Sequence, residues 1–233
     1  MTQPARQLAL ELSHRPALGR EDFLVTRSNA AAVAMIDQWP NWPAKAILLV
    51  GPAGSGKSHL VEVWRRKSRA GRIAAADLVE SDIPNLLANG ALAVEDAPGP
   101  GLDEKALFHL LNHANQQDAR LLITSNRHPR QWSVKLPDLR SRLQALPVVG
   151  LGAPGDDLLR GVLVKLFADR QLAVEEAVIS YLLLRMPRSL EAARTLVAEI
   201  DRRAMEERVE VTRTFAARVL NSLHAPGLFP EDD

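Results

Sequence analysis

Residues 46 to 69 combine an apolar run, a glycine-rich loop and a helical run, in that order. The loop, Gly51-Pro52-Ala53-Gly54-Ser55-Gly56-Lys57-Ser58, matches the pattern G-x-x-x-x-G-K-[ST] and lies between Ala46–Val50 and His59–Arg69. Glycines allow such a loop to turn so that successive backbone N–H groups point inward, where the helix N-terminus adds its positive dipole end. The pattern predicts a binding site for phosphate groups. A glycine-rich turn that matches by chance is the alternative.

Single positions of this loop have expected roles. The ammonium of Lys57 is expected to reach the β and γ phosphates of a nucleotide, and the hydroxyl of Ser58 to be a ligand for Mg²⁺. The pattern alone does not tell whether the γ-phosphate is cleaved, transferred or only sensed. The positions predicted to contact the nucleotide in this segment are Gly51, Gly54, Gly56, Lys57, Ser58 and His59.

Short apolar runs alternate with helical patterns from residue 22 to about residue 155. Runs of this kind are typical of strands buried on both faces of a parallel sheet, so we expect an α/β fold with helices on both faces of the sheet. After the turn-forming residues 152–155 the pattern is helical throughout. The predicted strands are Lys45–Val50, Arg72–Ala76, Ala91–Glu95, Leu121–Ser125 and Ala145–Val149, and the clearest helices are predicted at residues 103–118 and 190–208.

Composition excludes several classes of protein. The chain has 233 residues, 46% of them hydrophobic and 24% charged, which favours a packed core over disorder. Its net charge of +1 is too small for a protein that grips nucleic acid alone, and the absence of cysteine excludes disulfides and cysteine-ligated zinc. Neither a signal peptide nor a run of about 18 apolar residues is found, so we expect a soluble cytoplasmic protein with no membrane partner.

Two more strands are predicted to end in polar residues at the ligand-facing edge of the sheet. The strand that ends in Glu95-Asp96 is of the Walker B type, which holds Mg²⁺ and orients a water molecule. Because Glu95 stands where an aspartate is usual, we expect weak or no hydrolysis by this chain alone. Asn126 follows the strand Leu121–Ser125 and is expected to polarise a water molecule or touch the γ-phosphate, with an ordinary turn as the alternative.

Two arginines are candidate phosphate ligands outside the loop. Arg142 is a candidate arginine finger offered to a neighbouring protein's nucleotide, with a solvated surface arginine as the alternative. Arg188 begins the long predicted helix, where the helix dipole disfavours a cation and a phosphate would compensate. His109 and His113 are one helical turn apart, but without a third ligand nearby they are interpreted as surface or packing residues.

The order of these motifs resembles that of AAA+ ATPases of the bacterial replication initiator DnaA group, over about residues 22 to 223. The resemblance implies a P-loop AAA+ three-layer sandwich over residues 21–154 and a small all-helical lid domain over residues 155–233. It implies an adenine nucleotide, ADP or ATP, with Mg²⁺ held by Ser58 and Glu95. The remaining roles that it implies are Glu95 and Asp96 as Walker B, Asn126 as sensor 1, Arg142 as the arginine finger, Arg188 as sensor 2 and Phe23 in the adenine pocket.

A DnaA protein continues into a C-terminal DNA-reading domain, for which we expect no room before Asp233. The pattern is instead similar to that of the Hda group of DnaA-related regulators, which begin with a short motif that binds the sliding clamp. Here the motif would lie in a flexible tail of residues 1–20, and a stray amphipathic tail is the alternative. Its clamp-binding side chains would be Gln7, Leu8, Leu10 and Leu12.

The resemblance implies a negative regulator of replication initiation. With the DNA-loaded sliding clamp (the polymerase β subunit), it would stimulate hydrolysis of DnaA-bound ATP and convert the initiator to its inactive ADP form. DNA would be contacted only through the clamp and DnaA. The resemblance leaves open whether the chain forms a homo-oligomer. An ATP-driven remodeller, such as a helicase loader, is the main alternative and needs robust turnover. A small-molecule kinase is a further alternative, but it would need a domain that binds the molecule that accepts the phosphate.

Overall fold

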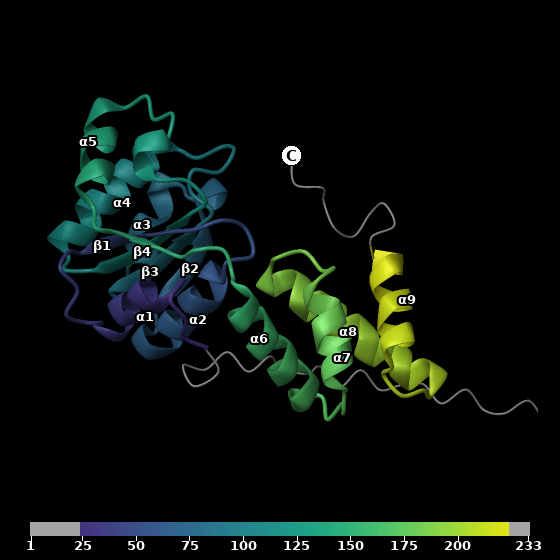
Figure 1. Cartoon of the computed structure of the whole chain (residues 1–233). Coiled ribbons are helices and arrows are strands. Elements are labelled where there is room, and N and C mark those ends of the chain that lie inside the picture. Colours follow the sequence, from purple (N-terminus) through teal and green to yellow (C-terminus); the bar gives the residue numbers. More distant parts are fainter. Residues whose placement is uncertain (1–23, 224–233) are drawn as a thin grey trace, which may run out of the picture.

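The computed structural model describes residues 24–223, and within them five strands form one sheet (Figure 1). The strand order is β2-β3-β4-β1-β5, and every neighbouring pair is parallel. The three inner strands, β3, β4 and β1, are buried along nearly their whole length, which explains why their sequences are continuous apolar runs. The strands are β1 (Ala46–Val50), β2 (Gly71–Ala74), β3 (Ala91–Glu95), β4 (Arg120–Ser125) and β5 (Val148–Gly150).

Helices cover both faces of this sheet (Figure 1). Alternate residues of a strand point to opposite faces, so Ile47 and Leu49 pack with α1 and α2 whereas Leu48 packs with α3, α4 and α5. In the described part of the chain, three short 3₁₀ turns lie at residues 75–77, 80–82 and 129–131. The helices are α1 (Ala30–Asp37), α2 (Lys57–Ser68), α3 (Ile83–Leu86), α4 (Glu104–Gln116) and α5 (Pro137–Ala145).

The helices that follow β5 form a part with its own core, which we call the helical part. It comprises α6 (Asp156–Asp169), α7 (Glu176–Leu183), α8 (Leu190–Glu207) and α9 (Arg213–Leu223). Large side chains from all four helices meet in this core. A parallel sheet between helices, followed by helices alone, confirms the predicted fold class. No helix among residues 24–223 is long and apolar enough to cross a membrane.

Two strand boundaries differ from the prediction by more than one residue. The sequence pattern begins the last strand at Ala145, but this residue is the final one of α5, and β5 begins at Val148. The reason lies in Pro147, which has no N–H to donate and disfavours helical backbone at the residue before it, so the helix ends just before this point. The predicted strand Arg72–Ala76 is also too long, because Ala75 already belongs to a 3₁₀ turn.

Candidate functional site

The glycine-rich loop leaves the middle of the sheet and leads directly into α2. β1 is an inner strand between β4 and β5. The loop follows the last residue of β1, Val50, and so begins at the carboxyl edge of the sheet. Gly54 and Gly56 have φ angles of 68° and 99°, in the left-handed region that a residue without Cβ adopts at low cost. A Cβ on Gly51 would lie 2.6 Å from the carbonyl oxygen of Leu151. The backbone geometry therefore requires glycine at all three predicted positions.

The ammonium of Lys57 lies over this loop. Its Nζ donates hydrogen bonds to the carbonyl oxygens of Gly51, at 2.7 Å, and Pro52, at 2.9 Å. Burial lowers the pKa of Lys57, while the carboxylates of Asp96 and Glu95 oppose that shift. The loop thus holds a buried positive charge at the place where the sequence predicts phosphate groups.

Two serines of the loop differ in their surroundings. Ser58, in the first turn of α2, is exposed, as a hydroxyl that binds a metal next to a nucleotide has to be. Ser55 is buried, and its Oγ has no hydrogen-bond partner among the described residues. Because a buried hydroxyl without a partner is costly, an oxygen-rich anion in the loop would satisfy it. The sequence pattern does not single out Ser55, because it occupies a variable position of the loop motif.

The acidic pair at the end of β3 divides into a buried and an exposed residue. Glu95 is buried, and its Oε1 lies 2.5 Å from Nε of Arg72 on β2, in an ion pair whose angles are not those of a hydrogen bond. Asp96 is exposed and has a φ of 61°, with its N–H donating to Oγ1 of Thr124 at 3.0 Å. The unusual backbone of Asp96 is thus fixed by the neighbouring strand β4.

The oxygen donors at this edge suit Mg²⁺. A hydroxyl at Ser58 and carboxylates at Glu95 and Asp96 are the donor types that this ion prefers. Among residues 24–223, no group of three or more His, Cys, Asp or Glu side chains is placed to hold a metal ion by itself. Mg²⁺ at sites of this kind is usually held by one or two carboxylates together with nucleotide phosphates and water, and these donor types fit that pattern.

Asn126 lies at the same edge of the sheet. It follows β4 directly and is exposed. The carbonyl oxygen of Ser125 accepts a hydrogen bond from the N–H of Gly51 at 3.0 Å, and that of Thr124 accepts one from Ala97 at 2.9 Å. These bonds join the end of β4 to the start of the phosphate loop and to the acidic pair, as the parallel sheet predicts.

The helical part contacts the phosphate loop directly through the start of α8. The N–H of Leu190 donates to the carbonyl oxygen of Gly54 at 3.0 Å. Ser189, the N-cap of α8, packs against the Cα of Gly54, where a Cβ would come within 2.1 Å of its Oγ. The phosphate loop and the start of α8 are therefore joined by a backbone hydrogen bond and a close packing contact.

The two arginines near this junction have different partners. Arg188 precedes the N-cap of α8, is largely exposed, and pairs with Asp156 of α6 at 2.8 Å. Its predicted contact with a phosphate stays a prediction. Arg194, one turn into α8, places its Nη2 2.8 Å from Nδ1 of the buried His59 on α2. No sequence signal points to Arg194, because its partner is 135 positions away.

A methyl group at Gly54 is expected to disturb this junction. In Gly54→Ala the new Cβ meets Ser189 and the backbone keeps a φ that disfavours alanine, so we expect a loss of roughly 1–3 kcal/mol in unfolding free energy. Urea denaturation measures this loss. Gly155→Ala is the matched control, because nothing lies within 4 Å of a Cβ there. Equal stability of the two variants would contradict the tight contact.

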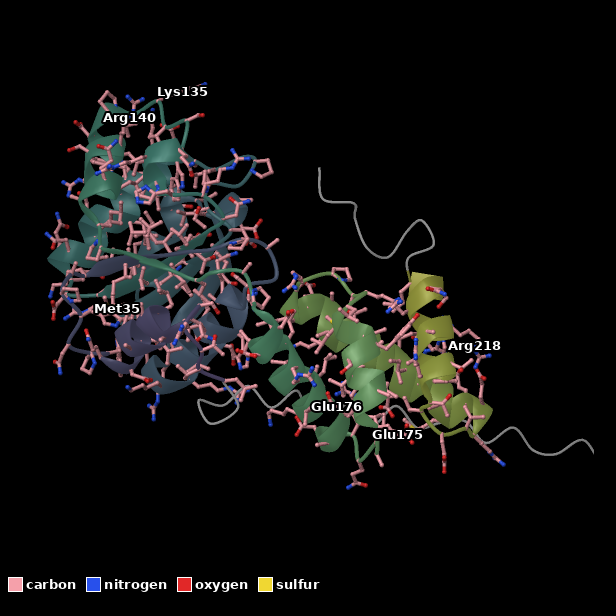
Figure 2. All side chains as sticks on the ribbon, viewed as in Figure 1. Met35, Lys135, Arg140, Glu175, Glu176 and Arg218 are labelled. Atoms are coloured by element: carbon pink, nitrogen blue, oxygen red, sulfur yellow. The ribbon has the colours of Figure 1, made fainter. Side chains whose placement is uncertain are left out.

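Arg142 lies away from the phosphate loop. It is exposed on α5, in the helical layer on the opposite side of the sheet from α2, and its guanidinium carbon is 5.2 Å from the centre of the Phe108 ring. Figure 2 places its neighbour Arg140 at the end of the α/β part that points away from the helical part. Arg140 is also exposed, but its guanidinium donates a hydrogen bond to the carbonyl oxygen of Val134.

The structure therefore brings together the phosphate loop, Glu95, Asp96 and Asn126, and places Arg142 elsewhere. Phe23 and the predicted clamp-binding residues Gln7, Leu8, Leu10 and Leu12 lie outside the described residues. Their roles stay predictions.

Comparisons with known proteins agree with the fold described above. No protein-family model matches the chain. A protein of Haemophilus influenzae described as uncharacterized is 26% identical over 183 residues, which cover 73% of this chain and 79% of that protein. Domain III of the replication initiation protein DnaA from Thermotoga maritima is similar in structure, with a TM-score of 0.75 and 19% identity over 91% of this chain and 98% of that one.

Two further solved structures share the fold. DnaA from Aquifex aeolicus bound to AMPPCP gives a TM-score of 0.66 at 18% identity, over 84% of this chain and 71% of that one. A mutant of RuvB from Thermotoga maritima gives a TM-score of 0.69 at 15% identity, over 88% of this chain and 72% of that one. With its parallel sheet in the order β2-β3-β4-β1-β5 and the helices that follow, the chain has the AAA+ fold of DnaA and RuvB.

Proposed function

We propose that this chain is a regulator of the Hda type, which binds an adenine nucleotide with Mg²⁺ and promotes hydrolysis of the ATP held by DnaA. The observation that carries the proposal is the position of Arg142, exposed on α5 in the layer opposite α2. An arginine on the face of the sheet opposite α2 is available to the nucleotide of a docked partner. Arginine fingers supplied in this way stabilise the charge that develops during phosphoryl transfer.

The likeness to DnaA supports the choice of partner. Two AAA+ proteins of similar shape can dock so that one supplies a finger to the other's nucleotide, and the DnaA domain gives a TM-score of 0.75. AMPPCP, an analogue of ATP, is bound in DnaA structures of the same fold, which supports an adenine nucleotide in the phosphate loop. Hydrolysis of DnaA's ATP would leave the initiator in its ADP form, so the chain would act as a negative regulator of replication initiation.

The proposal includes a tether to the DNA-loaded sliding clamp through Gln7, Leu8, Leu10 and Leu12. A glutamine amide can form hydrogen bonds in a pocket while leucines fill an apolar groove, which is how short linear segments are commonly recognised. The clamp would raise the local concentration of the chain near DNA-bound DnaA, and this gain requires no direct contact between the chain and DNA.

An assay with loaded clamp, ATP-bound DnaA and this chain tests the proposal. We expect hydrolysis of DnaA's ATP to rise only when chain and loaded clamp are both present. Alanine at Gln7, Leu8 and Leu10 together should abolish clamp binding in a pull-down and remove the stimulation, with unfolding free energy unchanged within about 0.5 kcal/mol. A variant that still binds the clamp would place the contact elsewhere, and a variant that unfolds would assign these residues to the core.

An ATP-driven remodeller, such as a helicase loader, is the second candidate. It is favoured by the likeness to RuvB of Thermotoga maritima, described as a Holliday junction branch migration motor, at a TM-score of 0.65. A remodeller depends on its own hydrolysis, so Glu95→Gln would abolish its action on a partner. In the regulator proposed here, the same substitution leaves Arg142 available, and stimulation of DnaA persists.

A further inference from the structure

The edge strand β2 places an arginine beside the buried acid of the candidate site. β2 and β3 are parallel, with Ala74 opposite Glu95, and Arg72 lies two residues before Ala74. Residues two apart on a strand point to the same face, so Arg72 and Glu95 share a face. Ala91 and Ala93 of β3 pack with α2, which identifies this as the face that carries α2 and Lys57.

The two partners of this ion pair differ greatly in exposure. The side chain of Glu95 is 4% exposed and that of Arg72 is 54% exposed, and Oε1 of Glu95 lies 2.5 Å from Nε of Arg72. The arginine is reached by water, whereas the buried carboxylate depends on its partner, because a buried charge without a partner is costly. Glu95 is therefore a buried carboxylate whose cationic partner lies at the surface.

We infer that Arg72 is a positioning residue that opposes the use of Glu95 as a magnesium ligand. This inference rests on the proposed nucleotide site. The carboxylate of Glu95 would have to interact with two cations at once. The guanidinium beside Oε1 neutralises part of the negative charge that would attract the metal ion. A unit charge about 5 Å from a divalent ion weakens its binding by about tenfold even in a dielectric like that of water.

This arrangement explains how a complete phosphate loop can belong to a protein that acts on another protein's ATP. The chain keeps the loop, Lys57 and the acidic pair, and so keeps its affinity for a nucleotide. Arg72 reduces the contribution that the metal ion makes to this affinity. The opposite role for Arg72 is that of an orienting group that improves Glu95 as a ligand, as neutral hydrogen-bond partners of metal ligands do. The two roles predict changes of opposite sign when the charge is removed.

Binding of ADP to the full chain, with Mg²⁺ and with EDTA, tests the inference by isothermal titration calorimetry. The quantity compared is the ratio of the Kd in EDTA to the Kd in Mg²⁺, which reports the metal's contribution without any hydrolysis. Arg72→Gln should raise this ratio about tenfold, the factor expected for the charge, and Arg72→Lys, which keeps the charge, should leave it near the parent value. Arg202→Gln is the matched control, since Arg202 is 52% exposed and pairs with carboxylates on α8, away from the loop.

Each outcome decides for or against the inference. An unchanged ratio in Arg72→Gln assigns Arg72 a structural role alone, and a smaller ratio makes it an orienting group; both overturn the inference. Thermal denaturation of each variant shows whether it is folded, and Arg72→Met, which also removes the charge and should raise the ratio, supplies a second test if Arg72→Gln is not. A parent chain that binds no ADP overturns the inference together with the nucleotide site. Failure to stimulate DnaA, with a ratio that still responds to Arg72, would instead overturn the proposed function alone.

Discussion

Arg142→Ala is expected to bind the sliding clamp and ADP like the parent chain, yet to lose nearly all stimulation of DnaA-bound ATP hydrolysis. The reason is that a finger acts on charge that develops only in the transition state, so its loss affects the rate more than docking. Fingers of this kind contribute about 10³ to 10⁵ in rate, and less where the partner has basal activity. Single-turnover hydrolysis of ATP preloaded on DnaA measures the effect.

Two further variants sharpen this test. Arg142→Lys should fail nearly as badly, because a point charge does not reproduce the planar fork that meets two phosphate oxygens. Arg202→Ala, which removes an exposed arginine from α8, should stimulate normally. Normal stimulation of DnaA by both Arg142 variants would identify Arg142 as an ordinary surface residue. If Glu95→Gln then abolished the stimulation, the result would favour the remodeller.

The second large effect is expected at Lys57. A ligand that binds only the folded state adds about 2.7 kcal/mol at 100 times its Kd, so ADP with Mg²⁺ should raise the melting temperature of the parent by roughly 5–10 °C. Lys57→Ala should remove this shift, because the buried ammonium over the loop is the main positive charge that the phosphates would meet. Differential scanning fluorimetry with and without nucleotide measures it.

Lys67→Ala is the matched control for this experiment. Lys67 lies in the last turn of the same helix and also donates to a backbone carbonyl, that of Asp37 at 3.0 Å, but at the far end from the loop. Its replacement should leave the nucleotide-induced shift intact. A parent chain whose melting temperature is the same with and without millimolar ADP or ATP would contradict the phosphate site.

The parts of the site that could be predicted from sequence are local or follow from sheet geometry. The phosphate loop between β1 and α2 is a continuous segment, and its glycines indicate the conformation of its backbone. Glu95 and Asn126 are far apart in sequence, but parallel strands bring their carboxyl ends to one edge, so the prediction of a shared site needs only the strand assignments. The sequence pattern misplaces the beginning of β5 because apolar residues of α5 and β5 run together, and only Pro147 separates them.

The contacts between distant segments could not be predicted in this way. The pairs Arg72–Glu95 and Arg194–His59, and the packing of Ser189 on Gly54, each join residues whose spacing carries no pattern. Arg188 shows the limit most clearly. It pairs with Asp156 of α6, a residue that nothing in the local sequence connects with Arg188, and its predicted contact with a phosphate stays a prediction.

A measurement of which protein's ATP is hydrolysed tests the central claim most directly. DnaA is loaded with ATP labelled on the γ-phosphate and mixed with this chain, loaded clamp and an excess of unlabelled ATP, and the converse experiment places the label on this chain. Release of labelled phosphate from DnaA, at a rate that depends on clamp and on Arg142, is the predicted result. Labelled ATP that stays intact on DnaA while the label on this chain is released would contradict the account.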